Sequence, residues 1–437
     1  MSSDFYKYEI YSKTLKLTKY LQVLKSRHYS NNAPIYFAQD LQKILDVIRN
    51  NLDNVLDVHL QELNNFLDTY FLSFSSIIEK SSPSYVPWSL IPELEELTSN
   101  LISHNEMVLI RSENFFNYSI HITDVMSEFL TILRKFIGDI EDLKEDKYNK
   151  PRIFTIPLLE KNNALLHSIL FHELGHYYEK DFSNSRETQR FINETIAQTI
   201  KEDDEITEKT LFTSAQAIDM LKGFIREIYS DIFALYCCGI PILFCTYHFL
   251  KAYPEPSLPS KKNNYYPPLK FRLRLLYNIC KNEGIIEKVT SAKGKAYEVL
   301  TEALTSIERA LDNKNDIDIL NTTPASLITS KATEKIKDKI TLDISNKINP
   351  NHGDFENVNK LYDKLLDSIP PCELDGNPQK IEKILVAGWA AYFHFNKMEN
   401  IEERYEKIKT LNLICLKAMT QSFFFRKFLK ARNGDTN

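Results

Sequence analysis

Glycine is scarce in this chain, with ten residues among 437. A β-rich chain of this length would need many more glycines for its tight turns. Long runs such as "LQKILDVIRNNLDNVLDVHLQELNNFLDTYFL" instead repeat apolar residues at spacings of three and four, as amphipathic helices require. Hydrophobic residues make up 43% of the chain and charged residues 26%, which is the balance of a globular protein. We therefore expect a mainly α-helical fold.

Changes in pattern divide the chain into three predicted regions. We expect an N-terminal helical region over residues 1–150, a compact core over residues 151–285 and a C-terminal helical region over residues 286–437. The core should contain a small β element, because Pro151 and Pro157 bracket "RIFTI" and predict a short edge strand there. At the rim of a cleft, such an edge can pair with an extended peptide through main-chain hydrogen bonds.

Three further segments carry specific expectations. A helix should start near Ala164, with Asn162 or Asn163 as its N-cap. A second helix is expected from about Thr213 to Gly239. Residues 315–354 have a low density of apolar side chains, which predicts a weakly packed and mobile stretch.

Charge and cysteine usage exclude several classes of protein. The net charge of −5 and the isoelectric point near 6.1 argue against a nucleic-acid binder, which would show a basic excess. The six cysteines form no CxxC pair, so neither zinc-finger spacing nor a disulfide framework is indicated. The N-terminal residues "MSSDFYKYEIYSKTLKL" lack the apolar stretch of a signal peptide. We expect reduced cysteines and a cytoplasmic location.

One apolar segment raises the question of a membrane. "IFALYCCGIPILFCTYHFL", residues 232–250, is nearly long enough to span a bilayer. It contains Gly239 and Pro241, and it follows an acidic helical stretch directly. We favour a buried core helix with a kink at Pro241 over a segment that contacts lipid.

The segment "LLHSILFHELGHYYEK", residues 165–180, is apolar nearly all round, which implies a buried helix. His172 and His176 are four residues apart and lie on one face, so both imidazoles can bind one metal ion. Glu173 lies beside this face, within reach of a zinc-bound water. We expect Gly175 to leave space beside the metal. The alternative is a buried helix whose histidines hydrogen-bond to the backbone.

A second polar pair follows downstream in "FIREIYSDIFALY". Glu227 and Asp231 are four residues apart and lead into an apolar run, where buried acids are costly unless a charge or a metal compensates them. We expect Glu227 to be the third zinc ligand. Asp231 should accept a hydrogen bond from the outer nitrogen of one ligand histidine. The alternative is an exposed pair of acids that form salt bridges with Arg226 or Lys222.

The "HELGH" and "EIYSD" elements together resemble those of gluzincin metallopeptidases, in which the third ligand is a glutamate on a following helix. "YPPLKFRL" resembles the "HPxxxxRL" element of gluzincins of the CAAX prenyl-protease type and their soluble relatives. Pro267 and Arg272 match that element, while Tyr266 stands where the family has histidine. The resemblance covers residues 165–275 and implies a helical zincin-like catalytic core with one zinc ion.

The expected reaction is zinc-dependent hydrolysis of peptide bonds in a selective intracellular protein substrate, by an endopeptidase rather than an exopeptidase. Glu173 would act as general base and then as general acid. The register of the resemblance makes Tyr266, or failing that Tyr265, a hydrogen-bond donor to the oxyanion. Arg272 would anchor its loop by pairing with a buried acid.

Two other functions remain open from the sequence. A non-catalytic helical scaffold could use zinc for folding alone, although such a protein would not need Glu173. A membrane-docked gluzincin protease would require residues 232–250 to contact lipid. We expect a protein or peptide as partner, no nucleic acid and no membrane.

Overall fold

The computed structural model describes residues 3–29, 31–87, 91–99, 106–115, 118–121, 124–201, 210–252, 266–312, 324–348 and 355–432. The described chain is mainly α-helical with a few short strands, as the glycine content and the apolar spacing predict. It divides into two compact units, Met1–Asn162 and Asn163–Asn437. Each unit is described by itself, and the division into three regions at residues 150 and 285 stays a prediction.

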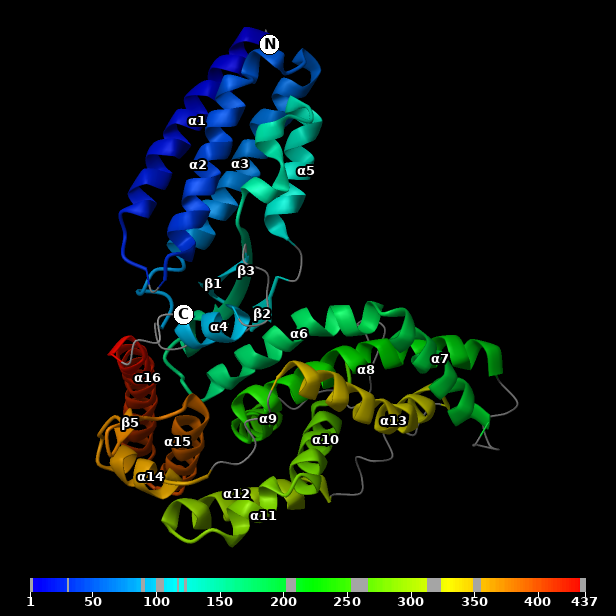
Figure 1. The fold of residues 1–437 in the computed structure, drawn as a ribbon, viewed down its shortest axis with the longest axis vertical. Helices are drawn as coiled ribbons and strands as arrows, with labels where there is room; N and C mark the ends of the chain where they lie inside the picture. The colour runs from blue at the N-terminus through cyan, green and yellow to red at the C-terminus, as the bar shows by residue number, and fades with distance from the viewer. Residues whose placement is uncertain are drawn as a thin grey trace. The chain divides into compact units, whose positions relative to one another are not determined.

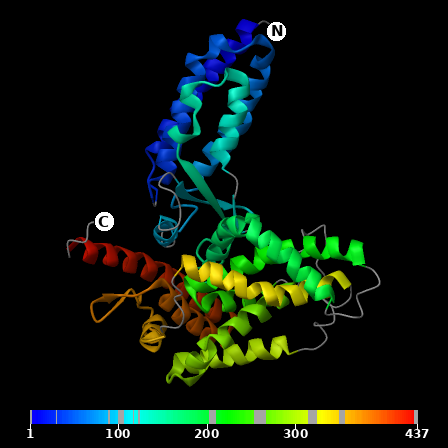
Figure 2. The ribbon, with the colours of Figure 1, turned by 45° about the vertical axis from the view of Figure 1, so that its right-hand side comes forward.

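Long antiparallel helices make up most of the first unit (Figure 1). Helix α1 packs against both α2 and α3, and α3 packs against α5, in both views of the ribbon (Figures 1 and 2). Asp124 caps α5 by accepting hydrogen bonds from two backbone N–H groups. The helices of this unit are α1 (Ser3–Lys25), α2 (Ala33–Asn50), α3 (Asp57–Glu79), α4 (Ile91–Ser99) and α5 (Val125–Ile137).

A three-stranded sheet completes the first unit, with strand order β1-β3-β2. Its strands are β1 (Glu106–Glu113), β2 (Ser119–Ile120) and β3 (Lys150–Pro157). Strand β3 contains "RIFTI" and pairs with β1 in parallel along its whole length and with β2 antiparallel. The prediction of an edge strand is therefore wrong: β3 is the central strand, and its prolines are tolerated because they lie near its two ends. A role for this strand at the rim of a cleft stays a prediction.

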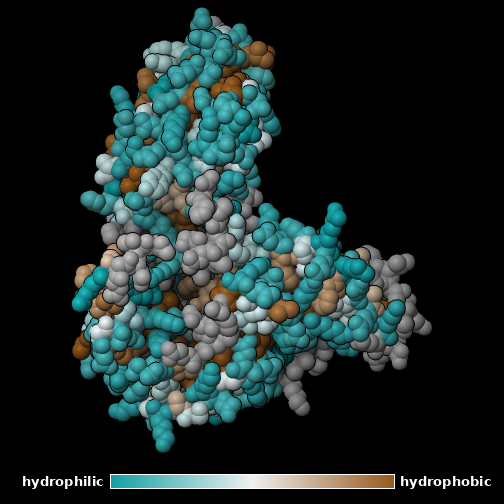
Figure 3. Space-filling model, viewed as in Figure 1, coloured by the Kyte–Doolittle hydropathy of each residue, from teal (hydrophilic) through white to brown (hydrophobic). Residues whose placement is uncertain are grey.

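Polar side chains cover most of the first unit on the face drawn in Figure 3, where hydrophobic residues show only as scattered areas. The apolar side chains of α1, α2, α3 and α5 lie inside and form one cluster. The aromatic ring of Phe129 contacts those of Phe66, Phe71 and Phe74 within this cluster. Burial of large rings at the helix contacts is the main source of stability for such a bundle.

The second unit is almost entirely helical (Figure 2). Helix α8 packs against α6, α13, α7 and α9, and so lies at the centre of the helices that concern the site. The elements are α6 (Ile169–Asn184), α7 (Arg186–Lys201), α8 (Thr210–Cys238), α9 (Pro241–Ala252), α10 (Leu269–Asn282), α11 (Ile285–Ser291), α12 (Lys295–Leu311), α13 (Pro324–Lys347), α14 (Val358–Leu366), β4 (Glu373–Leu374), β5 (Asn377–Pro378), α15 (Ile381–Phe395) and α16 (Ile401–Arg432).

Helix α13 lies within the segment that we expected to be weakly packed. Most of its residues are polar, but Ile328, Ile336, Ile340 and Ile344 are buried and recur at multiples of four. That spacing advances by about 40° round the helix every four residues, so the buried residues form a slowly winding stripe, and α13 packs against α8 and α7. The prediction of weak packing is therefore wrong for Pro324–Lys347, because a single stripe is sufficient to dock a helix even when apolar residues are few. The rest of the segment, apart from residue 348, lies outside the described residues.

The apolar segment 232–250 forms two helices instead of one kinked helix. Helix α8 ends at Cys238, Gly239 takes a positive φ of 70°, and α9 begins at Pro241. Glycine accepts this backbone conformation without strain, and proline is favoured in the first turn of the next helix. The prediction of burial is confirmed, since nearly all of the segment is buried. A search of the described helices finds none with the length and apolarity needed to cross a membrane.

Candidate metal centre

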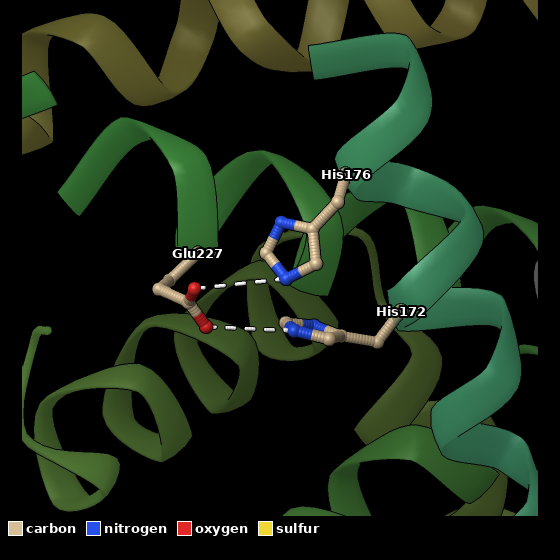
Figure 4. A group of neighbouring side chains, drawn as sticks. All are labelled: His172, His176 and Glu227. Carbon is tan, nitrogen blue, oxygen red and sulfur yellow. Dashed lines mark ion pairs between the residues drawn. The ribbon is translucent and has the colours of Figure 1, made fainter. Parts of the chain in front are cut away.

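Helix α6 carries the "HELGH" residues and begins later than expected. A 3-10 turn, Leu166–Ser168, precedes it, and the α-helix starts at Ile169 rather than near Ala164. His172 and His176 are one turn apart, and both are buried. Both rings point towards α8 (Figure 4).

Helix α8 approaches α6 closely at Gly175. A Cβ atom at this position would lie 2.6 Å from Cα of Ser230, a distance that no real packing allows. The glycine therefore lets α8 pack directly against α6. The expectation that it leaves space beside the metal is wrong, since the space is filled by the backbone of α8. This close approach brings the acids of α8 within reach of the two histidines.

Glu227 of α8 completes a group of three possible metal ligands (Figure 4). Glu227 is 2% exposed, and its carboxylate oxygens lie 3.5 Å from His172 Nε2 and 3.6 Å from His176 Nε2. One ligand atom from each residue can be chosen so that all three lie within 4.8 Å of one another. The three residues that the spacing of the sequence assigned to one metal therefore meet in the fold.

The outer nitrogen of each histidine has a hydrogen-bond partner that fixes the ring. His172 Nδ1 lies 2.8 Å from Asp231 Oδ1, and a carboxylate can only accept, so Nδ1–H donates. His176 Nδ1 lies 2.9 Å from Ser230 Oγ. Because Ser230 Oγ donates its own proton to the carbonyl oxygen of Arg226, it accepts from His176 Nδ1–H. In the neutral form of each ring, Nε2 therefore carries the lone pair and lies on the side of Glu227.

Arg272 of α10 holds the two acids of α8 in place. Its guanidinium makes a two-point contact with Asp231, at 2.7 Å from Nε and 2.6 Å from Nη2. Its Nη1 also lies 3.0 Å from Glu227 Oε2. The alternative of exposed acids that pair with Arg226 or Lys222 is excluded, because both acids are buried and pair with Arg272. Arg272 lies in the first turn of α10.

Burial and neighbouring charges shift the pKa values of the residues in the centre. Burial lowers the pKa of His172, but Asp231 outweighs this effect and raises it to about 9. Burial raises the pKa of Glu173 to about 7. Burial also lowers the pKa of His176 to about 3, so that this ring is neutral, as a metal ligand must be. In the protein alone, His172 therefore holds an extra proton beside Asp231, and a metal ion bound at Nε2 would displace a proton from this ring.

The donor atoms suit a metal ion. Ligands at ~2.0–2.1 Å from a tetrahedral zinc ion lie ~3.3 Å from one another, close to the 3.6 Å between His176 Nε2 and Glu227 Oε1. Glu227 Oε1 is buried and has no hydrogen-bond partner among the described residues, whereas Oε2 is held by Arg272. A buried acceptor without a donor is costly, and a metal ion at Oε1 would remove that cost. The centre therefore fits one metal ion held by His172, His176 and Glu227.

The two residues predicted to take part in the reaction lie near this group. Glu173 is 9% exposed, and it makes no hydrogen bond or ion pair with the described residues, so its carboxylate stays available to water. Tyr266 is 43% exposed and lines a cavity together with Glu227. Burial, and then the charge of Glu227, raise the pKa of the Tyr266 hydroxyl. Tyr265 lies outside the described residues.

Ser230 is the residue of the centre that the sequence analysis missed. It lies three residues after Glu227 and next to Asp231, so helical spacing alone places it beside the ligand face. A polar side chain in this position can bind the outer nitrogen of a ligand histidine. That rule could have identified Ser230 from the sequence. Its proximity to Gly175 was not predictable, since the contact depends on how α6 and α8 cross.

Comparisons with protein-family models, with curated proteins and with solved structures gave no match for this chain.

Proposed function

We propose that this protein is a zinc-dependent peptidase of the gluzincin type that acts in the cytoplasm. The observation that carries the proposal is the convergence of His172, His176 and Glu227, with both histidine Nε2 atoms directed at one point. Two imidazoles and one carboxylate are the ligand set of catalytic zinc sites that keep a further position open. The six free cysteines support a reducing compartment.

The role of each residue follows from its position. His172, His176 and Glu227 would hold the ion, while Asp231 and Ser230 keep the two rings in the required tautomer. Bound zinc would supply a Lewis acid that polarises the peptide carbonyl and lowers the pKa of water.

Glu173 and Tyr266 would carry the proton and hydrogen-bond chemistry. Glu173 has no competing partner, so it would take the proton from the attacking water and return it to the leaving amine. Tyr266 would donate a hydrogen bond from its hydroxyl group to the oxyanion, in the position where the resembling enzymes have histidine. A purely structural zinc site would need neither residue.

Glu173→Gln separates zinc binding from catalysis. We expect this variant to keep its zinc and its melting temperature, and to lose at least ~10²-fold in the rate of peptide cleavage. Comparison of protein fragments in cells that carry the wild type or the variant would identify the substrate. Cleavage at the wild-type rate by Glu173→Gln would favour the non-catalytic scaffold instead.

A further inference from the structure

A cavity of about 220 Å³ adjoins the metal centre. It is smaller than the ~300–1,000 Å³ of typical small-molecule sites, which is a size suited to one side chain or to the end of a peptide. The residues that line it come from α8 and from the chain just before α10: Lys222, Gly223, Arg226, Glu227 and Tyr266. Glu227 belongs both to this cavity and to the metal centre.

Two of the residues that line this cavity are cations. Lys222 and Arg226 are four residues apart on α8 and therefore lie on one face. In the part of the chain that the structure describes, neither side chain makes an ion pair or a hydrogen bond. Arg226 Nε is also shielded from solvent without an acceptor. A shielded guanidinium donor is stable only when an anion or another acceptor meets it, so the cavity is prepared for a negatively charged group.

The cations are close enough to the metal centre to act on the same substrate. Arg226 is within electrostatic range of Glu173 and of His176. It also directly precedes the ligand Glu227 in the chain. An anion bound in the cavity would therefore lie beside the peptide bond that the centre is proposed to cleave.

We propose that this cavity binds a carboxylate of the substrate, so that the enzyme selects peptides with a negative charge close to the cleaved bond. This inference rests on the proposed peptidase function. The guanidinium of Arg226 matches the planar geometry of a carboxylate, while the exposed Lys222 adds a second charge. The carboxylate belongs either to an Asp or Glu side chain or to the C-terminus of a peptide. The two cations would bind either carboxylate in the same way.

The test uses a library of fluorogenic peptides and the full, zinc-loaded chain. One position at a time is fixed as Glu, Gln or Lys while the others are mixed, and each peptide is made with a free and with an amidated C-terminus. We expect kcat/KM to be at least ~10-fold higher for Glu than for Gln at one position, or for the free acid over the amide. The first result identifies a side-chain carboxylate, and the second identifies a C-terminal one.

Variants that change the charge of the cavity test whether the cavity causes the preference for acidic peptides. Arg226→Gln should lower the ratio of kcat/KM for acidic over neutral peptides by ~10-fold. Lys222→Glu should shift the preference towards Lys peptides, a gain that misfolding cannot produce. Lys180→Gln is the matched control, because it removes one charge from an exposed position on α6 that does not line the cavity, and it should leave the ratio unchanged.

A binding measurement keeps this inference distinct from the proposed function. Zinc-loaded Glu173→Gln should bind acidic peptides more tightly than neutral ones, and Arg226→Gln in that background should remove the difference. If the wild type cleaves no peptide of the library, the peptidase proposal fails, whatever the binding shows. If it cleaves but treats Glu, Gln and both C-termini alike, or keeps its acidic preference in Arg226→Gln, the carboxylate site is overturned.

Discussion

Each histidine of the metal centre has its outer nitrogen occupied by a different kind of acceptor. Asp231 is charged and also holds Arg272, whereas Ser230 is neutral and holds only the ring of His176 and the helix backbone. A carboxylate raises the basicity of a ligand histidine more than a hydroxyl does. We infer that Asp231 contributes to the charge balance of the centre, while Ser230 sets the orientation of one ring.

This difference predicts the effect of removing the hydroxyl. Ser230→Ala takes away the acceptor for His176 Nδ1–H, so zinc affinity should fall by about 10–100-fold while the fold is kept. Competition with a chelating dye measures this change. Ser183→Ala is the control, because it removes a hydroxyl from α6 that hydrogen-bonds Glu179 and no ligand. Equal zinc affinity in wild type and Ser230→Ala would show that the ring is held by packing alone.

At the scale of the element, the crossing of α6 and α8 makes the centre. The pairing of His172 with His176 was readable from the sequence, because helical geometry fixes which residues share a face. Glu227 was found in another way, from the cost of burying an acid that leads into an apolar run. The position of β3 was not, because its partners in the sheet come from distant segments of the chain. Helix α13 was missed because its single apolar stripe is diluted by polar residues, and a count of apolar density does not detect such a stripe.

The crossing also predicts that one methyl group will disrupt the centre. Gly175→Ala places a Cβ atom 2.6 Å from the backbone of Ser230, so α8 must move away from α6. Overpacking of this kind costs ~1–3 kcal/mol in stability, and zinc affinity should fall as Glu227 moves from the histidines. Thermal unfolding and zinc titration measure the two effects.

A second glycine provides the comparison. The Cβ atom of Gly388→Ala in α15 would meet the side-chain ends of Leu165 and Cys415, which can shift more easily than backbone. This variant should lose less stability and keep its zinc affinity. The account of the crossing is wrong if Gly175→Ala binds zinc as tightly as the wild type.

At the scale of the whole molecule, every residue of the metal centre lies in the second unit, Asn163–Asn437. Zinc bound only to the folded centre stabilises the unit that contains it through mass action, by ~2.7 kcal/mol at a free concentration of 100 times Kd. The sequence has two tryptophans, Trp88 and Trp389, and Trp389 is buried in the second unit. A single tryptophan can therefore report on that unit.

This arrangement gives a prediction for metal addition. In a Trp88→Phe variant, zinc should raise the unfolding temperature followed by the fluorescence of Trp389 by about 5 °C. The same variant with Glu227→Ala should show no rise, since it lacks one ligand. A rise of equal size in both proteins would mean that zinc binds elsewhere.

The number of zinc ions per chain, measured by elemental analysis after dialysis, tests the central claim most directly. We predict about one zinc per chain for the wild type and little for Glu227→Ala. Glu179→Ala is the matched control and should keep its zinc, since Glu179 is a buried glutamate on α6 that belongs to no ligand group. Full zinc in Glu227→Ala would contradict the claim that His172, His176 and Glu227 form the metal centre.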